Sequence, residues 1–207
     1  SLRAAALIGC SVTTGVGTAI YAAGVTPGST VAVIGCGGVG LNVIQGARIA
    51  GATRIIAVDV NDAVLEFAGK FGATESVNAN SGDPLKAIKD LTNGKGVDYA
   101  FEAFGSSETI TLAFDAARKH GTAVIAGLAP VGEQAGIDGV ALVRQEKTLK
   151  GAYYGASKPS IDFYHMIDLY KSVPNFLLCD RFRWEHPLMT PTCHASYMHC
   201  NTCATEE

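Results

Sequence analysis

Charged residues and long apolar runs are both scarce in this 207-residue sequence. Asp, Glu, Lys and Arg make up 17% of it, and sixteen basic against nineteen acidic side chains leave a net charge of −3 without long blocks of one sign. This excludes the basic surface expected of a protein that binds nucleic acid or anionic membranes. No stretch of eighteen consecutive residues is apolar, which excludes a membrane-spanning helix. The apolar fraction of 48% instead predicts a folded chain with a substantial core.

Glycine is missing from the last 35 residues, although the sequence holds 24 glycines in all. The same stretch holds four of the six cysteines, three of the five histidines and the only Trp. We therefore predict a lead-in helical segment (1–29), a folded body (30–172) and an atypical, loosely ordered tail (173–207). The sequence does not begin with Met and reaches glycine too early for a secretion signal. We expect it to be the interior of a longer cytoplasmic protein.

The cysteines of the tail allow two interpretations. Cys193, Cys200 and Cys203, together with His194 or His199, have the residue types of a zinc knuckle. Their spacing matches no finger pattern, and the tail has no glycine for the tight turns that a knuckle needs. A shifted reading frame or a truncated end is the interpretation that we favour.

The body alternates short apolar runs with segments of helical periodicity. The runs are rich in β-branched residues and do not alternate with polar ones, which is typical of strands covered on both faces. Strands separated by helices of about ten residues predict right-handed βαβ units and a doubly wound parallel Rossmann sheet of about six strands. The expected strands are 31–34, 54–59, 76–77, 97–101, 123–126 and 149–154, and the expected helices are 5–23, 40–50, 62–71, 83–91, 109–117 and 160–170.

A glycine-rich loop joins the first strand to its helix. Gly35 permits a tight turn, Gly37 and its neighbours Gly38 and Val39 bring the backbone close to a diphosphate, and Gly40 lets the helix pack against the strand. The second strand ends in Asp59, nineteen residues after Gly40. A carboxylate there binds a ribose 2′-hydroxyl and repels a 2′-phosphate, so the pattern predicts NAD in preference to NADP.

Two other nucleotide sites and a reactive thiol compete with this interpretation. A phosphate-binding P-loop would need Lys and Ser or Thr after its last glycine, where this sequence has Leu41 and Asn42. An S-adenosylmethionine-dependent methyltransferase also uses a glycine loop, but commonly has an acid where this sequence has Ile34. Cys36, inside the loop, is expected to be a small space-filling residue, although a thiol at a helix N-terminus can have a lowered pKa.

Seven motifs occur together in an order that resembles one family. They are LIGCSVTTGVG (7–17), VIGCGGVG (33–40), VDVN (58–61), FGAT (71–74), GVDY (96–99), FE (101–102) and KGAYYG (150–155). They resemble the coenzyme domain of zinc-dependent alcohol dehydrogenases of the medium-chain dehydrogenase superfamily, closest to the glutathione-dependent formaldehyde dehydrogenase branch. The resemblance covers residues 1–172.

This resemblance implies that the chain is the NAD-binding domain of an enzyme that transfers hydride between a primary alcohol or its aldehyde and NAD. It makes Cys10 one of three protein ligands of a catalytic zinc, which acts on the alcohol oxygen as a Lewis acid. The other two ligands are expected upstream of Ser1, so we expect no turnover by this chain alone. In one departure from the family, Val64 stands where a Lys often meets the adenosine ribose. The implied contacts of the nicotinamide half are Thr14, Val39, Phe104, Ala126, Leu128 and Tyr154.

The resemblance also implies a homodimer formed by pairing of edge strands, with 136–143 and 149–154 as candidate segments. No nucleic-acid or membrane partner is expected. A bare dinucleotide-binding module or an inert fragment without catalysis remains the alternative to the dehydrogenase.

Overall fold

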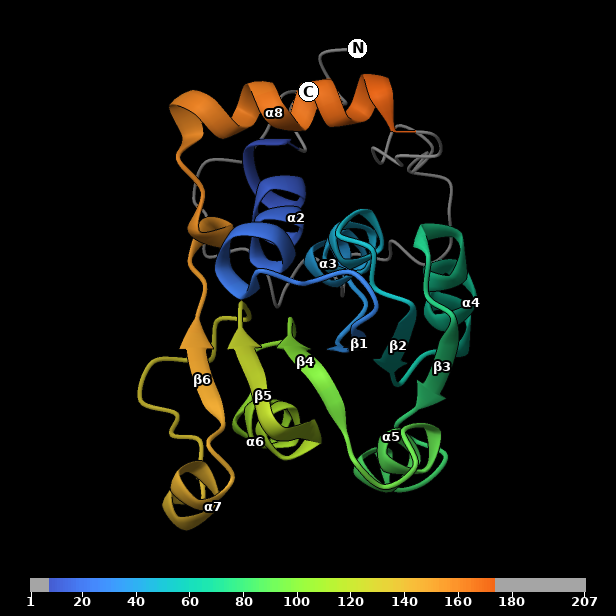
Figure 1. Ribbon diagram of the computed structural model, residues 1–207, viewed down its shortest axis with the longest axis vertical. Helices are drawn as coiled ribbons and strands as arrows, with labels where there is room; N and C mark the ends of the chain where they lie inside the picture. Colours follow the sequence, from blue (N-terminus) through green and yellow to red (C-terminus); the bar gives the residue numbers. More distant parts are fainter. Residues whose placement is uncertain (1–7, 174–207) are drawn as a thin grey trace, which may run out of the picture.

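The computed structural model describes residues 8–173, which form an α/β fold around one parallel sheet (Figure 1). The six strands lie in the order β3-β2-β1-β4-β5-β6, and every neighbouring pair is parallel. This confirms the predicted doubly wound Rossmann architecture. The strands are β1 (Thr30–Ile34), β2 (Arg54–Asp59), β3 (Glu75–Asn78), β4 (Val97–Glu102), β5 (Ala117–Ile125) and β6 (Thr148–Gly151). The predicted tail, apart from its first residue Val173, lies outside the described residues, and so do its cysteines.

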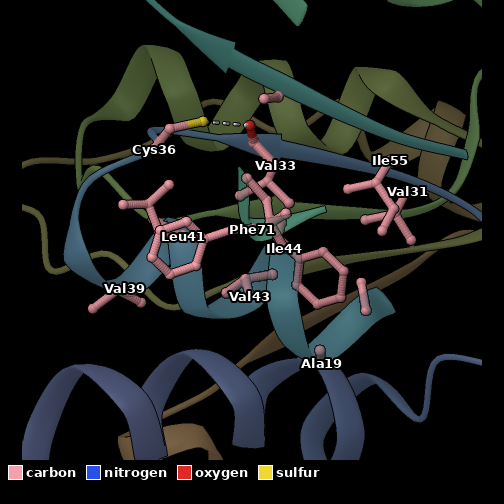
Figure 2. Packing of buried hydrophobic residues seen from close by; sticks show 14 of the residues in the cluster. Ala19, Val31, Val33, Cys36, Val39, Leu41, Val43, Ile44, Ile55 and Phe71 are labelled. Atoms are coloured by element: carbon pink, nitrogen blue, oxygen red, sulfur yellow. Dashed lines mark hydrogen bonds between the residues drawn. The ribbon is translucent and has the colours of Figure 1, made fainter. Parts of the chain in front are cut away.

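Helices cover both faces of the sheet and bury its central strands (Figure 1). One core joins Val33 and Phe101 of the sheet to residues of α3 (Gly38–Ile49) and α4 (Asp62–Phe71), and Figure 2 shows part of it. A second core joins Ala32 and Ala100 to residues of α5 (Pro84–Leu91) and α6 (Ser107–Ala116) on the opposite face. The uninterrupted apolar character of β1 and β2 therefore reflects burial on two sides.

Local sequence signals fix most of the helix starts. Asn61, Asp83, Ser106 and Asp138 each precede a helix and accept hydrogen bonds from its first backbone amides, as N-cap residues do. The helices that follow the first strand are α3 (Gly38–Ile49), α4 (Asp62–Phe71), α5 (Pro84–Leu91), α6 (Ser107–Ala116), α7 (Gly139–Arg144) and α8 (Pro159–Ser172). Within the described residues, no helix is long and apolar enough to cross a membrane.

The lead-in segment is helical, as predicted, with the turns η1 (Ile8–Val12), α2 (Thr13–Gly17) and η2 (Thr18–Ala23) following one another. Its glycines allow close packing. A Cβ on Gly15 would lie 2.4 Å from the Asn42 side chain, and one on Gly17 would lie 2.8 Å from the Gly155 carbonyl oxygen. The segment therefore lies directly against α3 and against the turn that follows β6.

Two strands and one candidate dimer segment differ most from what was expected. β5 begins at Ala117. Ala117 pairs with Val97, and a register shift separates this pair from the regular pairing that begins at Tyr99 and Thr122. β6 ends at Gly151, and Tyr154 instead begins the short 3₁₀ turn η3 (Tyr154–Ala156). The candidate dimer segment 136–143 does not form a strand, since most of it lies in α7, whose start is capped by Asp138.

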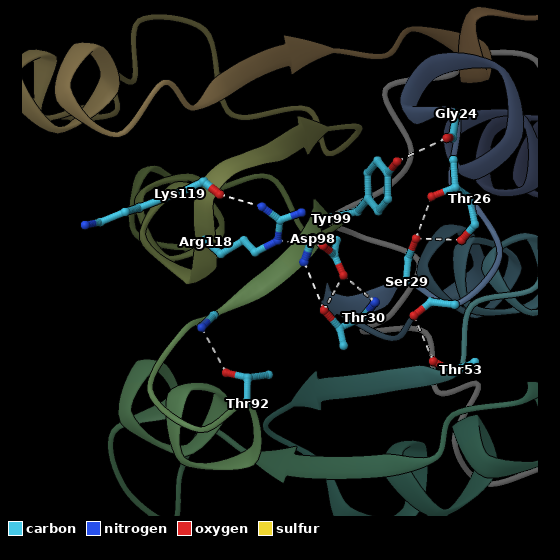
Figure 3. A network of polar contacts seen from close by, with 12 residues as sticks. Gly24, Thr26, Ser29, Thr30, Thr53, Thr92, Asp98, Tyr99, Arg118 and Lys119 are labelled. Carbon is cyan, nitrogen blue, oxygen red and sulfur yellow. Dashed lines mark hydrogen bonds and ion pairs between the residues drawn. The ribbon is translucent and has the colours of Figure 1, made fainter.

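A polar network ties the amino ends of three strands together (Figure 3). The Asp98 carboxylate accepts hydrogen bonds from the Thr30 backbone amide and hydroxyl, both at 2.7 Å, and from Arg118 Nε at 2.6 Å. Partial burial works against ionisation of Asp98, but these hydrogen bonds outweigh it and lower the pKa of the carboxyl. The network lies at the edge of the sheet opposite the glycine loop.

Candidate functional site

The glycine loop leaves β1 through a left-handed turn that only glycine adopts easily. Gly35 has φ +86°, and its amide donates to the Val58 carbonyl oxygen at 2.9 Å. A Cβ on Gly35 would lie 3.1 Å from the Phe104 side chain. The turn is thus held between the carboxyl ends of β2 and β4, at the point where the strand order of the sheet reverses.

Gly40 and Gly37 have different spatial roles. A Cβ on Gly40 would lie 1.9 Å from the Gly35 carbonyl oxygen, so only glycine fits where α3 approaches the turn. A Cβ on Gly37 would meet nothing within 4 Å, and Gly37 caps α3 without any side-chain hydrogen bond. Open space therefore lies in front of the first turn of α3, where Gly38 and Val39 follow, and this is the place that a phosphate occupies in such folds.

Asp59 lies beside this loop, as its position at the end of β2 predicted. Its Oδ2 accepts a hydrogen bond from the Cys36 amide at 2.8 Å, and its Oδ1 accepts one from the Asn61 amide at 3.1 Å. The two amides hold the carboxylate at the carboxyl edge of the sheet. The half-buried carboxylate still has acceptor capacity for a further partner.

Cys36 is a buried space-filling residue (Figure 2). Its Sγ lies 3.8 Å from the Val33 carbonyl oxygen and 3.6 Å from that of Val58. Burial, and then the nearby charge of Asp59, raise the pKa of the thiol far above its usual range. The interpretation of Cys36 as a space-filling residue is supported, and the activated thiol is not.

The expected residues of the nicotinamide half come from five segments: α2, the start of α3, and the turns after β4, β5 and β6. Thr14 and Val39 are buried, whereas 55% of Phe104, 78% of Leu128 and 42% of Tyr154 is exposed. Ala126, at the end of β5, is half-buried.

Close backbone approaches connect these segments. A Cβ on Gly105 would lie 2.5 Å from the Leu128 carbonyl oxygen, and one on Gly155 would lie 2.8 Å from the Thr14 carbonyl oxygen. The turns after β4, β5 and β6 therefore meet the glycine loop and the lead-in helix along one edge of the sheet.

Glu102 is a buried acid at this edge that sequence reasoning noticed only as part of a motif. Its Oε1 accepts hydrogen bonds from the amides of Phe104 at 2.8 Å and Gly105 at 2.6 Å, and from Thr109 Oγ1 at 2.8 Å. The available signal was an acid at the last position of an apolar strand. Its partners follow from the tertiary structure.

The metal prediction has only a partial basis. Cys10, the expected zinc ligand, is exposed in η1. Within residues 8–173, no three His, Cys, Asp or Glu side chains lie close enough together to hold a metal ion. A catalytic zinc needs three protein ligands, so the described residues do not by themselves fit that metal. Cys10 could serve only together with ligands from elsewhere.

Comparison with known proteins identifies the family. Residues 38–172 match the family model described as zinc-binding dehydrogenase. The chain belongs to the zinc-binding dehydrogenase family. It is 40% identical over 163 residues to S-(hydroxymethyl)glutathione dehydrogenase of Saccharomyces cerevisiae, covering 76% of this chain and 42% of that protein.

Two solved structures of this family share the fold. Benzyl alcohol dehydrogenase from Acinetobacter calcoaceticus is 36% identical, with a TM-score of 0.77, over 79% of this chain and 45% of that one. A protein from Sinorhizobium meliloti 1021, bound to NADP in its crystal structure, is 31% identical, with a TM-score of 0.70, over 77% of this chain and 46% of that one. The chain thus spans less than half the length of these zinc-binding dehydrogenases.

Proposed function

We propose that this chain is the dinucleotide-binding part of an NAD-dependent dehydrogenase that interconverts primary alcohols and aldehydes. The observation that carries the proposal is the 2.8 Å hydrogen bond from the Cys36 amide to Asp59, which holds an acid directly beside an open glycine loop. A ribose hydroxyl and a diphosphate can then be bound at adjacent places on one sheet edge.

The first turn of α3 supports the diphosphate part of the proposal. Four other helices begin with a side chain that accepts from their first amides, but α3 begins after Gly37, whose residue type has no side chain to do so. Its amides and the positive end of the helix dipole can therefore interact with an anion. The absence of any atom within 4 Å of a Cβ at Gly37 leaves the room for one.

Asp59 supports NAD as the nucleotide. Its carboxylate can accept hydrogen bonds from the 2′-hydroxyl of an adenosine ribose and would repel a 2′-phosphate. Val64, on the first turn of α4, offers no compensating cation. The family includes a structure bound to NADP, so the preference has to be measured for this chain.

The exposed residues at the crevice support a site for the nicotinamide half. Phe104, Leu128 and Tyr154 are exposed and offer apolar surface to a flat ring. We assign Thr14 and Val39 to the wall formed by the lead-in helix and α3. The assignment follows the motifs of the family, and the convergence of these segments on the loop supports it.

Catalysis requires more than the described residues provide. The names of the relatives support an alcohol or aldehyde substrate. Zinc, bound in a complete site, supplies Lewis-acid chemistry to such enzymes. Because Cys10 is the single expected ligand in the described chain, we expect the chain alone to bind NADH without turning over alcohol.

Calorimetry of the full chain tests the proposal. NADH should bind more tightly than NADPH, and S-adenosylmethionine, the ligand of the competing methyltransferase interpretation, should not bind. A primary alcohol with NAD and zinc should give no NADH absorbance at 340 nm. Folded protein that binds S-adenosylmethionine but not NADH would reverse the choice between the two nucleotide sites.

We also propose that the chain pairs with a second copy through the edge of the sheet. β6 is the outermost strand beside β5, and all four of its residues are exposed. An open strand edge is a surface on which a second strand can pair. Light scattering that gives the mass of one chain at micromolar concentration would count against this dimer.

A further inference from the structure

Glu102 occupies the centre of the sheet at its carboxyl edge. It is the last residue of β4 and is in register with Ile34 of β1 and Ile125 of β5. Its side chain is fully buried, on the face where Ala100 packs toward α6. Burial of a carboxyl group costs free energy unless hydrogen bonds compensate, so the acid at this position calls for an explanation.

Both polar ends of Glu102 contact turns of the proposed cofactor crevice. Oε1 accepts from the amides of Phe104 and Gly105 in the turn after β4. The backbone carbonyl oxygen accepts from the amides of Ala126 at 2.8 Å and Gly127 at 3.1 Å in the turn after β5. Glu102 thereby joins the turn that carries Phe104 to the turn that carries Ala126 and Leu128.

The fit around Glu102 leaves no spare room. A Cβ on Gly127 would lie 2.5 Å from Glu102 Oε2 and 2.4 Å from the Gly105 amide nitrogen. Oε2 itself is buried and has no hydrogen-bond partner among the described residues. A buried, unpartnered oxygen lowers stability. A residue kept at such a cost is typical of a functional position.

We propose that Glu102 is a positioning residue for the nicotinamide half of the dinucleotide. Through Oε1 it holds the turn at Phe104 against the turn at Ala126, and so sets the width of the crevice between them. This inference rests on the function proposed above. It adds a role that depends on the acceptor atom of Glu102 and not on its charge.

Two substitutions separate the acceptor from the charge. Glu102→Gln keeps an acceptor oxygen at the same reach and removes the charge. Glu102→Asp keeps the charge but withdraws the acceptor by one carbon–carbon bond, about 1.5 Å. If Glu102 acts as proposed, the Asp variant should be impaired and the Gln variant should resemble the wild type.

The readout is the ratio of the affinities for NADH and ADP-ribose, measured by calorimetry on the full chain. ADP-ribose shares the adenosine and the diphosphate with NADH but lacks the nicotinamide ring. A variant that is only less stable has a smaller folded fraction, and this lowers the apparent affinity for both ligands by the same factor. In the Asp variant we expect NADH affinity to fall about tenfold more than ADP-ribose affinity, which corresponds to about 1.4 kcal/mol. The Gln variant should keep the ratio within about twofold.

Thr92→Ala is the matched structural control, because Thr92 clamps the turn at the other end of the same strand (Figure 3). The buried Thr92 hydroxyl accepts from the Gly96 amide at 3.0 Å and donates to the Ile88 carbonyl oxygen at 2.8 Å. Its loss should lower thermal stability and leave the ligand ratio unchanged.

The outcomes distinguish the two levels of inference. If the wild-type chain is folded and binds neither ligand, the proposed function fails. If the wild type binds both, the positioning role alone is wrong in either of two cases. In one, Glu102→Asp keeps the wild-type affinity ratio; in the other, the ratio falls as much in Glu102→Gln as in Glu102→Asp. Should the Asp variant not fold, Thr109→Val removes one donor to Oε1. It should lower the ratio about threefold, and an unchanged ratio would overturn the role.

Discussion

Two glycines of one loop should respond to the same substitution in opposite ways. At Gly37 a methyl group would meet no atom within 4 Å, and the backbone (φ −70°, ψ −164°) is one that alanine adopts easily. At Gly40 the methyl carbon would lie 1.9 Å from the Gly35 carbonyl oxygen and 2.9 Å from its carbonyl carbon. We therefore expect Gly37→Ala to weaken cofactor binding without loss of stability, and Gly40→Ala to destabilise the chain.

The magnitudes follow from these contacts. Overpacking of a core costs about 1–3 kcal/mol, and here the opposing atoms belong to a backbone turn that cannot rotate away, so about 3 kcal/mol is expected for Gly40→Ala. In a chain of this length that lowers the unfolding temperature by about 6–12 °C. For Gly37→Ala, a poorer N-cap and a less flexible unfolded chain nearly cancel, within about 0.5 kcal/mol. Its methyl group, however, would occupy the space proposed for the diphosphate.

Thermal unfolding followed by circular dichroism gives the stability, and calorimetry with NADH gives the affinity. NADH affinity should fall at least about tenfold in Gly37→Ala. The control is Gly69→Ala on α4. A Cβ on Gly69 would also meet nothing within 4 Å, and Gly69 is distant in sequence from the glycine loop. Alanine in that exposed helix should stabilise the chain by about 0.5–1 kcal/mol and leave NADH binding unchanged.

One result would refute the reasoning about the loop. If the wild-type chain binds NADH and Gly37→Ala binds it equally tightly, the diphosphate does not lie over the first turn of α3. A Gly40→Ala variant as stable as the wild type would likewise show that α3 does not approach the Gly35 turn as closely as described.

Three further predictions concern single ionisable side chains. Asp59→Asn should reduce the preference for NADH over NADPH about tenfold in calorimetry, because the repulsion of the 2′-phosphate is lost; an unchanged preference would contradict the role of Asp59. The pKa of Asp98 is lower in the folded chain than in the unfolded one, so its stabilising contribution is present above about pH 4 and lost as the pH falls further. Thermal melts between pH 5 and pH 2 should therefore fall less steeply for Asp98→Asn than for the wild type. Iodoacetamide at pH 8 should alkylate the exposed Cys10 and spare Cys36, whose pKa burial raises; rapid labelling of Cys36 in peptide mass spectra of the folded protein would contradict this.

The sequence was sufficient to predict the central strands and the loop because these depend on local patterns. β2 ends at Asp59 as expected, since a continuous apolar run followed by turn residues marks a buried parallel strand. The first turn of α3 follows Gly37 because Gly35 permits the left-handed turn after β1 and Gly40 lets α3 pack against that turn. The position of Asp59 beside the loop then follows from the neighbouring places of β1 and β2 in the sheet.

Features that depend on tertiary contacts were not predictable. The helix α7 is the exception, because its signal is local: Asp138 is an N-cap residue, although the apolar and β-branched residues that follow it also suit an edge strand. Tyr154 has φ +47°, which its sequence does not suggest. The contact between Gly155 and Gly17 of the lead-in helix determines that turn. Likewise, the hydrogen bonds of Glu102 require the register of three strands.

The carboxyl edge of the sheet combines closely packed turns with exposed apolar side chains. The turns after β1, β4 and β5 make backbone contacts that leave no room for a methyl group at Gly40, Gly105 and Gly127. Yet Phe104 and Leu128, which these turns carry, are more than half exposed. Apolar side chains on a rigid, solvent-facing edge are typical of a surface formed to receive another group. The Glu102 variants measure how much of the NADH affinity depends on the way these turns are held.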